Sequence, residues 1–310
     1  MKTSCAIGAV LIMFILLPFS GLFESNPKTE TGEYRIINVR IFYNTPAWEL
    51  AQAVNRQNTR QIAQIAEENP EVLNFQDPLY GMTLLFWAVG MEKYDSARAL
   101  LRAGADPDII SIHHGGTALY DTAGFSFVGA NRDARFVKLL LEYGADPNIG
   151  FVGSHRNCLT EIGRTPLMSS IGSNIEKTRA LVEAGADINF RTERGRTAAL
   201  EALWLPRGAR TCVNIEVEVM EYAYFLIVEK RADITQPWLR GESREEVAPV
   251  IFLREWFVKL DGAGHEKKMV IIEEFARQGV DYWATEIPEH VLERIKRLHP
   301  DTWEEYIKRY

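Results

Sequence analysis

Cysteine is scarce in this sequence of 310 residues. Only Cys5, Cys158 and Cys212 are present, and their spacing matches neither a zinc site nor the paired cysteines of a small secreted domain. This scarcity excludes a disulfide-stapled scaffold and a cysteine-based metal centre. With 46% hydrophobic residues, the chain is nevertheless long and apolar enough to bury a substantial core.

An excess of positive charge is also missing, since the formal net charge is −7. Affinity for nucleic acid comes largely from clustered lysine and arginine side chains. We therefore expect no nucleic-acid partner. A neutral or basic protein partner fits this charge balance better.

The common catalytic motifs are absent as well. The sequence has no Walker loop, dinucleotide fingerprint, His-Glu-x-x-His or Gly-x-Ser-x-Gly pattern, and we expect no cofactor. Two weak candidates are His113 beside His114, as metal ligands, and His155 near Cys158, as base and nucleophile. Adjacent side chains on an extended chain point to opposite sides, and the second pair has no third orienting group. A hydrolase or metal-binding protein is therefore only the alternative prediction.

The N-terminus carries an apolar run. Lys2 precedes 19 uncharged residues, from Cys5 to Phe23, which as a helix would reach about 28 Å, close to the thickness of a bilayer core. We predict a signal peptide or transmembrane helix over residues 1–23, and expect an uncleaved anchor because small residues do not flank a cleavage point. Lys2 before the run and glutamates after it place the remainder in the periplasm or outside the cell, and it is secreted if the leader is cleaved.

A phrase recurs along the middle of the chain, as "ALLRAGADPD", "LLLEYGADPN" and "ALVEAGADIN". Apolar residues stand at helical spacing before the glycine of each phrase. These glycines are Gly104, Gly144 and Gly185. Glycine accepts the left-handed conformation that ends a helix, and a proline shortly afterwards prevents the helix from resuming. Each phrase therefore predicts the end of a helix and the start of a loop.

A second motif opens a shorter helix in each unit. A threonine suits the N-cap position, and a glycine two residues earlier marks the turn that leads into it. The threonines are Thr83, Thr117, Thr165 and Thr197, and the glycines are Gly81, Gly115, Gly163 and Gly195. Each unit is thus a turn, two helices and a capped loop.

Together these motifs resemble the ankyrin repeat, whose pattern is G-x-T-P-L-H-x-A-A followed by a helix ending L-L-x-x-G-A-D-x-N. The resemblance implies an all-α solenoid of helix-turn-helix units. We predict an array over residues 43–282 with about five to six units, the first and last two degenerate. The first starts at Thr45 with Asn69 at the capping position, and the fifth has Arg231 in place of glycine. Gly-to-Gly spacings of 40 and 41 residues exceed the roughly 33 of the family, so loops are enlarged.

Two segments flank the array. Residues 24–42 are predicted as a polar linker and an extended lead-in, in which Ile37, Val39 and Ile41 alternate. Residues 283–310 contain apolar residues at helical spacing. A repeat stack exposes an apolar face at its end, so we predict C-terminal capping helices there, with a partner-binding helix as the alternative.

The resemblance also implies binding of a protein partner by the concave face and the loop tips. The residue four after each starting threonine is expected to face the groove, which selects Glu49, Trp87, Asp121, Ser169 and Glu201. The loop tips add Tyr80, Ile109, Ile110, His113, His114, Phe151, Arg156, Arg191 and Arg194. An exposed tryptophan among carboxylates is typical of a binding hot spot. Trp87 is therefore the leading candidate, with packing on the next helix as the alternative.

These inferences combine into one functional hypothesis. The sequence predicts a monomeric, non-catalytic scaffold that is membrane-anchored and binds a protein outside the cytoplasm. A sharper form is an immunity-like factor that blocks an exported toxin, because a signal followed by a rigid concave repeat suits holding a folded protein.

Overall fold

The computed structural model describes residues 35–124, 133–153, 160–205, 217–240 and 244–310. Helices dominate it. They are α1 (Trp48–Asn55), α2 (Thr59–Glu68), α3 (Leu84–Gly90), α4 (Tyr94–Arg102), α5 (Ala118–Ala123), α6 (Arg135–Glu142), α7 (Pro166–Ser170), α8 (Ile175–Glu183), α9 (Ala198–Trp204), α10 (Val217–Ala223), α11 (Val250–Arg254), α12 (Ala263–Arg277), α13 (Glu289–Leu298) and α14 (Trp303–Ile307).

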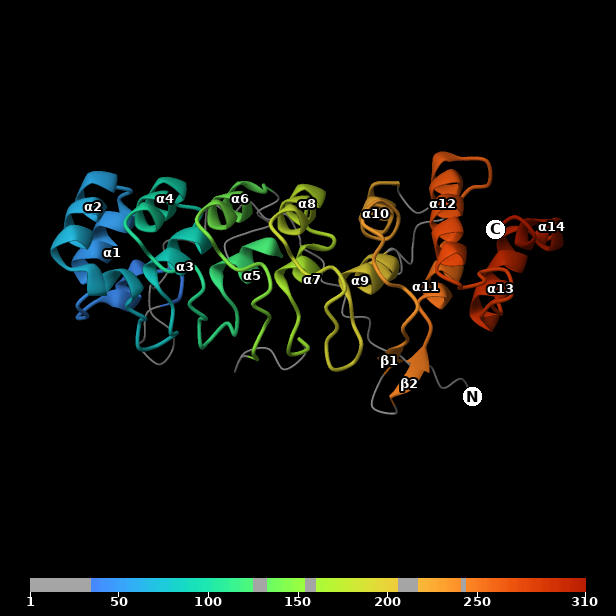
Figure 1. Cartoon of the computed structure of the whole chain (residues 1–310), viewed down its shortest axis with the longest axis horizontal. Coiled ribbons are helices and arrows are strands. Elements are labelled where there is room, and N and C mark those ends of the chain that lie inside the picture. Colours follow the sequence, from blue (N-terminus) through green and yellow to red (C-terminus); the bar gives the residue numbers. More distant parts are fainter. Residues whose placement is uncertain (1–34, 125–132, 154–159, 206–216, 241–243) are drawn as a thin grey trace, which may run out of the picture.

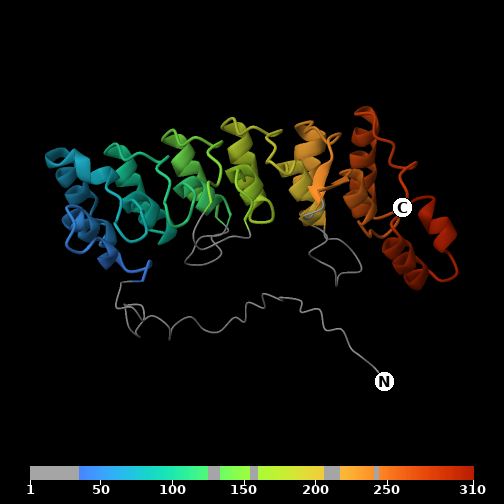
Figure 2. The same cartoon turned by 90° about the horizontal axis from the view of Figure 1, so that it is seen from below.

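The helices stack side by side in two layers. The even-numbered helices α2 to α12 form one row and the odd-numbered helices α1 to α11 the other, with the loops projecting beyond the odd-numbered row (Figure 1). Each helix packs on its layer neighbour, as α4 does on α2 and α6. Seen from below, the stack curves into an arc (Figure 2). The predicted all-α solenoid is confirmed.

The threonine caps lie where they were predicted. In α3, α5, α7 and α9 the threonine hydroxyl accepts a hydrogen bond from the backbone N–H three residues later. The first unit departs from this pattern, because α1 begins only at Trp48 and the Thr45 hydroxyl donates to the Phe42 carbonyl instead. Thr45 therefore does not cap a helix.

The loops after α4, α6 and α8 begin with a left-handed residue. The φ angles are 98° at Gly104, 86° at Gly144 and 90° at Gly185, and Arg231 takes the same conformation at 56° in the fifth unit. Asn69 stands at the C-cap of α2 as predicted, and its backbone N–H donates to the Ile65 carbonyl. It is not left-handed, because its φ is −140° and the 3-10 helix Pro70–Asn74 follows it directly.

Side-chain oxygens join successive loops into what we call the loop ladder. Its acceptors are Asn74, Asp108, Asn148 and Asn189, and each accepts the backbone N–H of an aspartate in the next unit at 2.7 to 2.9 Å. These donors stand directly after the left-handed turns. The ladder thus gives one exposed N–H of each of these loops a partner and joins one unit to the next.

The lead-in and the fifth loop differ from expectation. Val39–Phe42 is a short 3-10 helix rather than an extended segment, and it buries Ile41 and Phe42 against the first unit. The loop after α10 carries an antiparallel hairpin of β1 (Trp238–Arg240) and β2 (Glu245–Val247), which the sequence patterns did not reveal.

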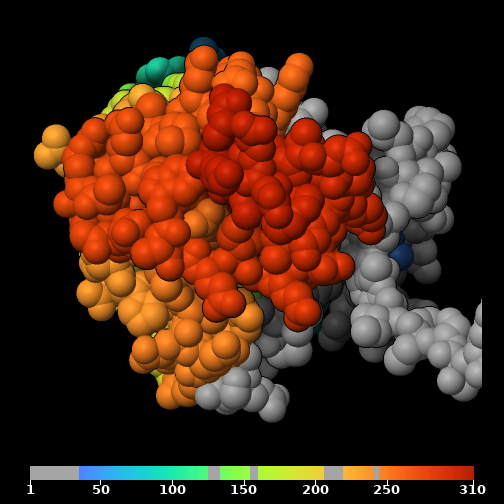
Figure 3. Space-filling view, turned by 90° about the vertical axis from the view of Figure 1, so that its right-hand side faces the viewer, coloured from blue at the N-terminus to red at the C-terminus, as the bar shows by residue number. Residues whose placement is uncertain are grey.

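One hydrophobic core runs through the array, from Ile41 to Tyr282. A second, smaller core of Phe257, Val291, Ile295, Tyr306 and Tyr310 lies under α13 and α14. In the end-on view these helices lie over much of the last face of the stack (Figure 3). Within the described ranges no helix is long and apolar enough to cross a membrane, and the run from Cys5 to Phe23 lies outside them.

A buried lysine joins two units. The Lys177 ammonium donates to the carbonyls of Thr122 and Gly124 at 2.8 and 3.1 Å, and to the Ser173 hydroxyl at 3.0 Å. It thereby satisfies carbonyls where the short helix α5 ends. Burial lowers the pKa of Lys177 to about 8.

The left-handed positions predict that two substitutions have different effects on the free energy of unfolding. Gly144→Ala should lower the free energy of unfolding by about 1 kcal/mol, because an alanine resists this conformation. Arg231→Gly should not lower it, because the arginine already bears that strain. Urea unfolding of both full-length variants measures the difference, and equal losses would contradict the assignment.

Lys177 predicts a pH dependence. In the folded chain its pKa is about 8, against the ordinary lysine pKa of 10.5 in the unfolded chain. Between these values the unfolded chain binds more protons, so stability rises with pH, by at most about 1.4 kcal/mol per pH unit. The free energy of unfolding of the wild type minus that of Lys177→Met should therefore increase between pH 7.5 and 9.5. A flat difference would show that Lys177 does not titrate there.

Candidate protein-binding surface

Trp87 is not an exposed hot spot, and the expectation that it faces the groove is wrong. Its side chain is 1% exposed, and its indole N–H donates to the carbonyl of Ile36 at 3.1 Å. The lead-in segment before the first unit covers it, so Trp87 is part of the core. Burial removes Trp87 from the accessible surface.

Two predicted loop-tip residues are buried for a similar reason. Tyr80 packs edge-on against His113 at 5.0 Å between ring centroids, and Phe151 stacks on Tyr120 at 5.7 Å. Neighbouring loops therefore shield each other's aromatic rings. Ile109 and Ile110, on the loop after α4, are half-buried.

The histidine pair belongs to this packed region. His114 lies against Phe86, and its Nδ1 is 3.6 Å from an Asp121 carboxylate oxygen. Among the residues described, no group of three or more His, Cys, Asp or Glu side chains is arranged to hold a metal ion. His155, Arg156 and Cys158 lie outside the described residues.

The remaining predicted residues are accessible to different degrees. Glu49, Arg191 and Arg194 are exposed, whereas Ser169 and Glu201 are half-buried on the odd-numbered helices. The Arg191 guanidinium donates to the Pro237 carbonyl of the next loop. The structure brings Glu201, Arg194 and Arg191 into neighbouring units but leaves Glu49 at the opposite end of the array (Figure 1).

Four apolar side chains stand exposed on successive loops, and we call them the tip row. They are Leu79, Ile112, Val152 and Ile162, with exposed fractions of 38%, 65%, 54% and 64%. Backbone hydrogen bonds hold the loops together, from His113 to the Tyr80 carbonyl and from Val152 to the Gly115 carbonyl. Exposed apolar residues gathered in this way are typical of an interaction site.

An ion network begins where the tip row ends. The Glu161 carboxylate, next to Ile162, lies 3.2 Å from the Arg196 guanidinium, and one Glu201 oxygen accepts from Arg164 at 2.8 Å and Arg196 at 2.9 Å. All four side chains are largely shielded from solvent. Their mutual contacts hold the two arginines in fixed orientations.

Trp204 lies on this network at the end of α9. The Arg196 guanidinium is 5.5 Å from the Trp204 ring and 5.4 Å from the Trp238 ring, within range of cation–π attraction. Trp204 is 43% exposed, and a shallow depression beside it also includes Leu200 and Phe252. We call Trp204, Trp238, Arg196 and Glu201 the Trp204 site.

Sequence reasoning selected Glu201 but missed Trp204. The two residues are three apart on one helix, so they share a face. Extending the search by one helical turn from the groove position would have found Trp204. Leu79 could be predicted at a loop tip beside Tyr80. Ile112, Val152 and Ile162 were harder to find, because the repeat pattern does not separate outward from inward positions within a loop.

This arrangement suits recognition. An exposed tryptophan, oriented arginines and an adjoining apolar row are the groups that dominate binding energy at protein interfaces. The surface is continuous because Glu161 connects the tip row to the Trp204 site.

The chain is similar to known proteins. The family model for the ankyrin repeat matches residues 80–112. The chain is similar to Protein PhlB of Serratia liquefaciens, at 35% identity over 204 residues that cover 65% of this chain and 80% of PhlB. The crystal structure of EF0377, an ankyrin repeat protein, is similar at 19% identity and a TM-score of 0.46, over 74% of this chain and 96% of EF0377.

The Trp204 site predicts that two substitutions differ in their effect on the free energy of unfolding. Glu201→Gln should lower the free energy of unfolding by about 2 kcal/mol, because two shielded arginines lose a shared carboxylate. Trp204→Ala should lower it by less than about 1 kcal/mol, since the residue is already 43% exposed in the folded chain. Chemical denaturation of both variants tests this, and a larger loss for Trp204→Ala would mean that the ring is a core residue.

Proposed function

The chain belongs to the same family as Protein PhlB of Serratia liquefaciens and is built from ankyrin repeats, and from that premise we propose a non-catalytic scaffold that holds a protein partner on the tip row and the Trp204 site. Ankyrin repeats imply a protein-interaction role. The observation that carries the specific proposal is the continuity of exposed apolar residues with an oriented arginine and an exposed tryptophan.

The rigidity of this surface supports the proposal. The loops are held to each other by backbone hydrogen bonds and by the loop ladder, so little order has to be gained on binding. Leu79, Ile112, Val152 and Ile162 offer apolar area, and the Trp204 site offers an exposed ring beside a charge-balanced ion network. A partner with an apolar ridge is complementary to both.

The proposal places the array outside the cytoplasm, with residues 1–23 as signal or anchor. What supports this is the uncharged run from Cys5 to Phe23, with Lys2 before it and glutamates after it. In its sharper form the partner is an exported toxin that the scaffold blocks as an immunity-like factor. A rigid array that holds a folded protein by a broad surface suits that task.

Crosslinking on intact cells tests the proposal. The full chain is treated with an amine crosslinker too charged to pass the inner membrane, and captured proteins are identified by mass spectrometry. We expect one protein to be captured with the wild type, and at least tenfold less with Trp204→Ala or Ile162→Asp, because each removes exposed contact area at the centre of the surface.

Trp283→Ala is the matched control, because Trp283 is exposed to a similar degree but lies between α12 and α13. It should capture as much partner as the wild type. Equal capture by all variants would exclude the proposed surface. Crosslinking only after the cells are broken would contradict the location outside the cytoplasm.

A further inference from the structure

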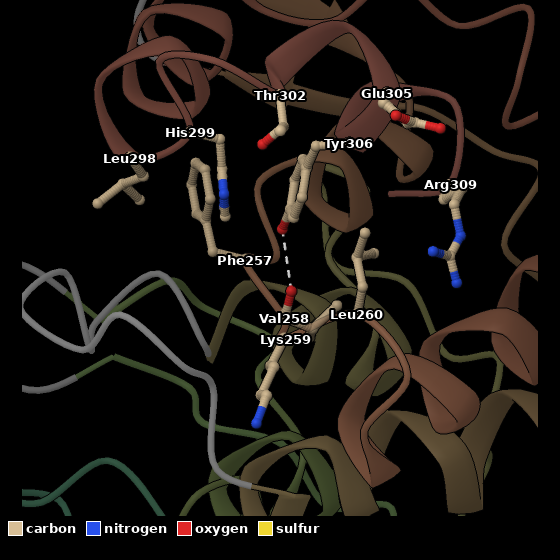
Figure 4. Close-up of a pocket in the computed structure, with 10 residues that line it drawn as sticks. All are labelled: Phe257, Val258, Lys259, Leu260, Leu298, His299, Thr302, Glu305, Tyr306 and Arg309. Carbon is tan, nitrogen blue, oxygen red and sulfur yellow. Dashed lines mark hydrogen bonds between the residues drawn. The ribbon is translucent and has the colours of Figure 1, made fainter.

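The C-terminal helices enclose an open cavity of about 480 Å³. Residues 257–260, which follow α11, form one wall, and the end of α13 together with α14 forms the other (Figure 4). A cavity of this volume can hold a few side chains of a bound peptide. The helices α13 and α14 that border the cavity lie at the C-terminal end of the array (Figure 1).

The interior of the cavity is aromatic and fixed in place. The His299 ring stacks on Tyr306 with 4.3 Å between centroids, and Tyr306 stacks in turn on Tyr310. The Tyr306 hydroxyl donates to the Val258 carbonyl at 2.9 Å, across the two walls. Figure 4 shows the His299 and Tyr306 rings beside Phe257 in the cavity. An apolar group can therefore enter a preformed aromatic site.

One of the protein's own cations already occupies a ring face. The Arg294 guanidinium is 4.2 Å from the Phe257 ring centre. A cationic ligand would find this face taken and would be repelled by the guanidinium. This arrangement favours a neutral or anionic group.

The rim carries charges of both signs. Lys259 lies below the rings in Figure 4 and Arg309 to their right, opposed in the lining by Glu305. Arg309 pairs with Asp261, whereas the Lys259 ammonium makes no hydrogen bond or ion pair with any described residue. Glu305 and Asp261 balance two positive charges in number, so Lys259 is the cation of this rim that has no partner among the described residues.

We propose that this cavity binds an acidic peptide segment of a protein partner, with one large apolar side chain on the aromatic floor and a carboxylate beside Lys259. The inference rests on the proposed function as a protein-binding scaffold and adds a second contact at the end of the array. It needs no contact at the Trp204 site.

Calorimetric titration of the purified full chain with two synthetic peptides tests the proposal directly. The acidic probe is acetyl-Glu-Glu-Phe-Glu-Glu-amide, and the basic probe replaces each glutamate by lysine. At low ionic strength, where charge interactions are least screened, the acidic peptide should bind at least tenfold more tightly. Lys259→Glu and Leu298→Asp should each weaken it at least tenfold, while Lys259→Arg retains binding.

Lys308→Glu is the matched control, because it makes the same change in net charge at an exposed lysine outside the cavity lining. It should leave the affinity unchanged. Similar affinities for the two peptides, no binding of either, or equal effects of Lys259→Glu and Lys308→Glu would overturn the proposal. Displacement of the acidic peptide by laurate that binds more tightly would also overturn it, in favour of a fatty-acid site. These titrations need no natural partner, so their failure is distinguishable from a failed crosslinking experiment.

Discussion

The structure depends on one repeated hydrogen bond, in which a side-chain oxygen of one unit accepts a loop N–H of the next. The loops are solvent-facing and have no strand or helix to satisfy their backbone, so these N–H groups need partners. Asn74, Asp108, Asn148 and Asn189 supply them at nearly constant distances. The left-handed residue before each donor directs the chain out of its helix, and the ladder then fixes where it goes.

This constraint explains how an exposed surface can be preorganised without being buried. The tip row is carried by loops that the ladder holds at their bases and backbone hydrogen bonds hold near their ends. The Trp204 site uses another means, since Glu201 shares one oxygen between two arginines and thereby immobilises the cation beneath an exposed ring. Both surfaces expose apolar or aromatic side chains to solvent. A core buries such side chains, and a binding site leaves them accessible to a partner.

Features that repeat locally could be predicted from sequence. Thr83, Thr117, Thr165 and Thr197 cap helices because the N-cap bond involves only residues three apart. Gly144 and Arg231 share one backbone conformation because the phrase around them is the same. Trp87 was misplaced because its exposure depends on Ile36, about fifty residues earlier.

Other features were hidden from sequence for the same reason. Lys177 reads as a surface lysine, yet it is buried because α5 ends early and leaves carbonyls that need a donor. The C-terminal cavity arises from contacts between segments that belong to no repeat. The candidate site was predicted only as far as Glu201 and its neighbours. The exposure of the other residues of the site depends on how neighbouring loops pack on each other, which the sequence pattern does not give.

Contacts in this array run mainly between adjacent units. A small rotation at each junction therefore adds to the next, so that the arc behaves as a spring whose ends move far more than any single joint. Such a body can follow the curvature of a convex object by sharing the strain over all its joints. Because of the same flexibility, a force applied at one end of the array changes the curvature at the other end.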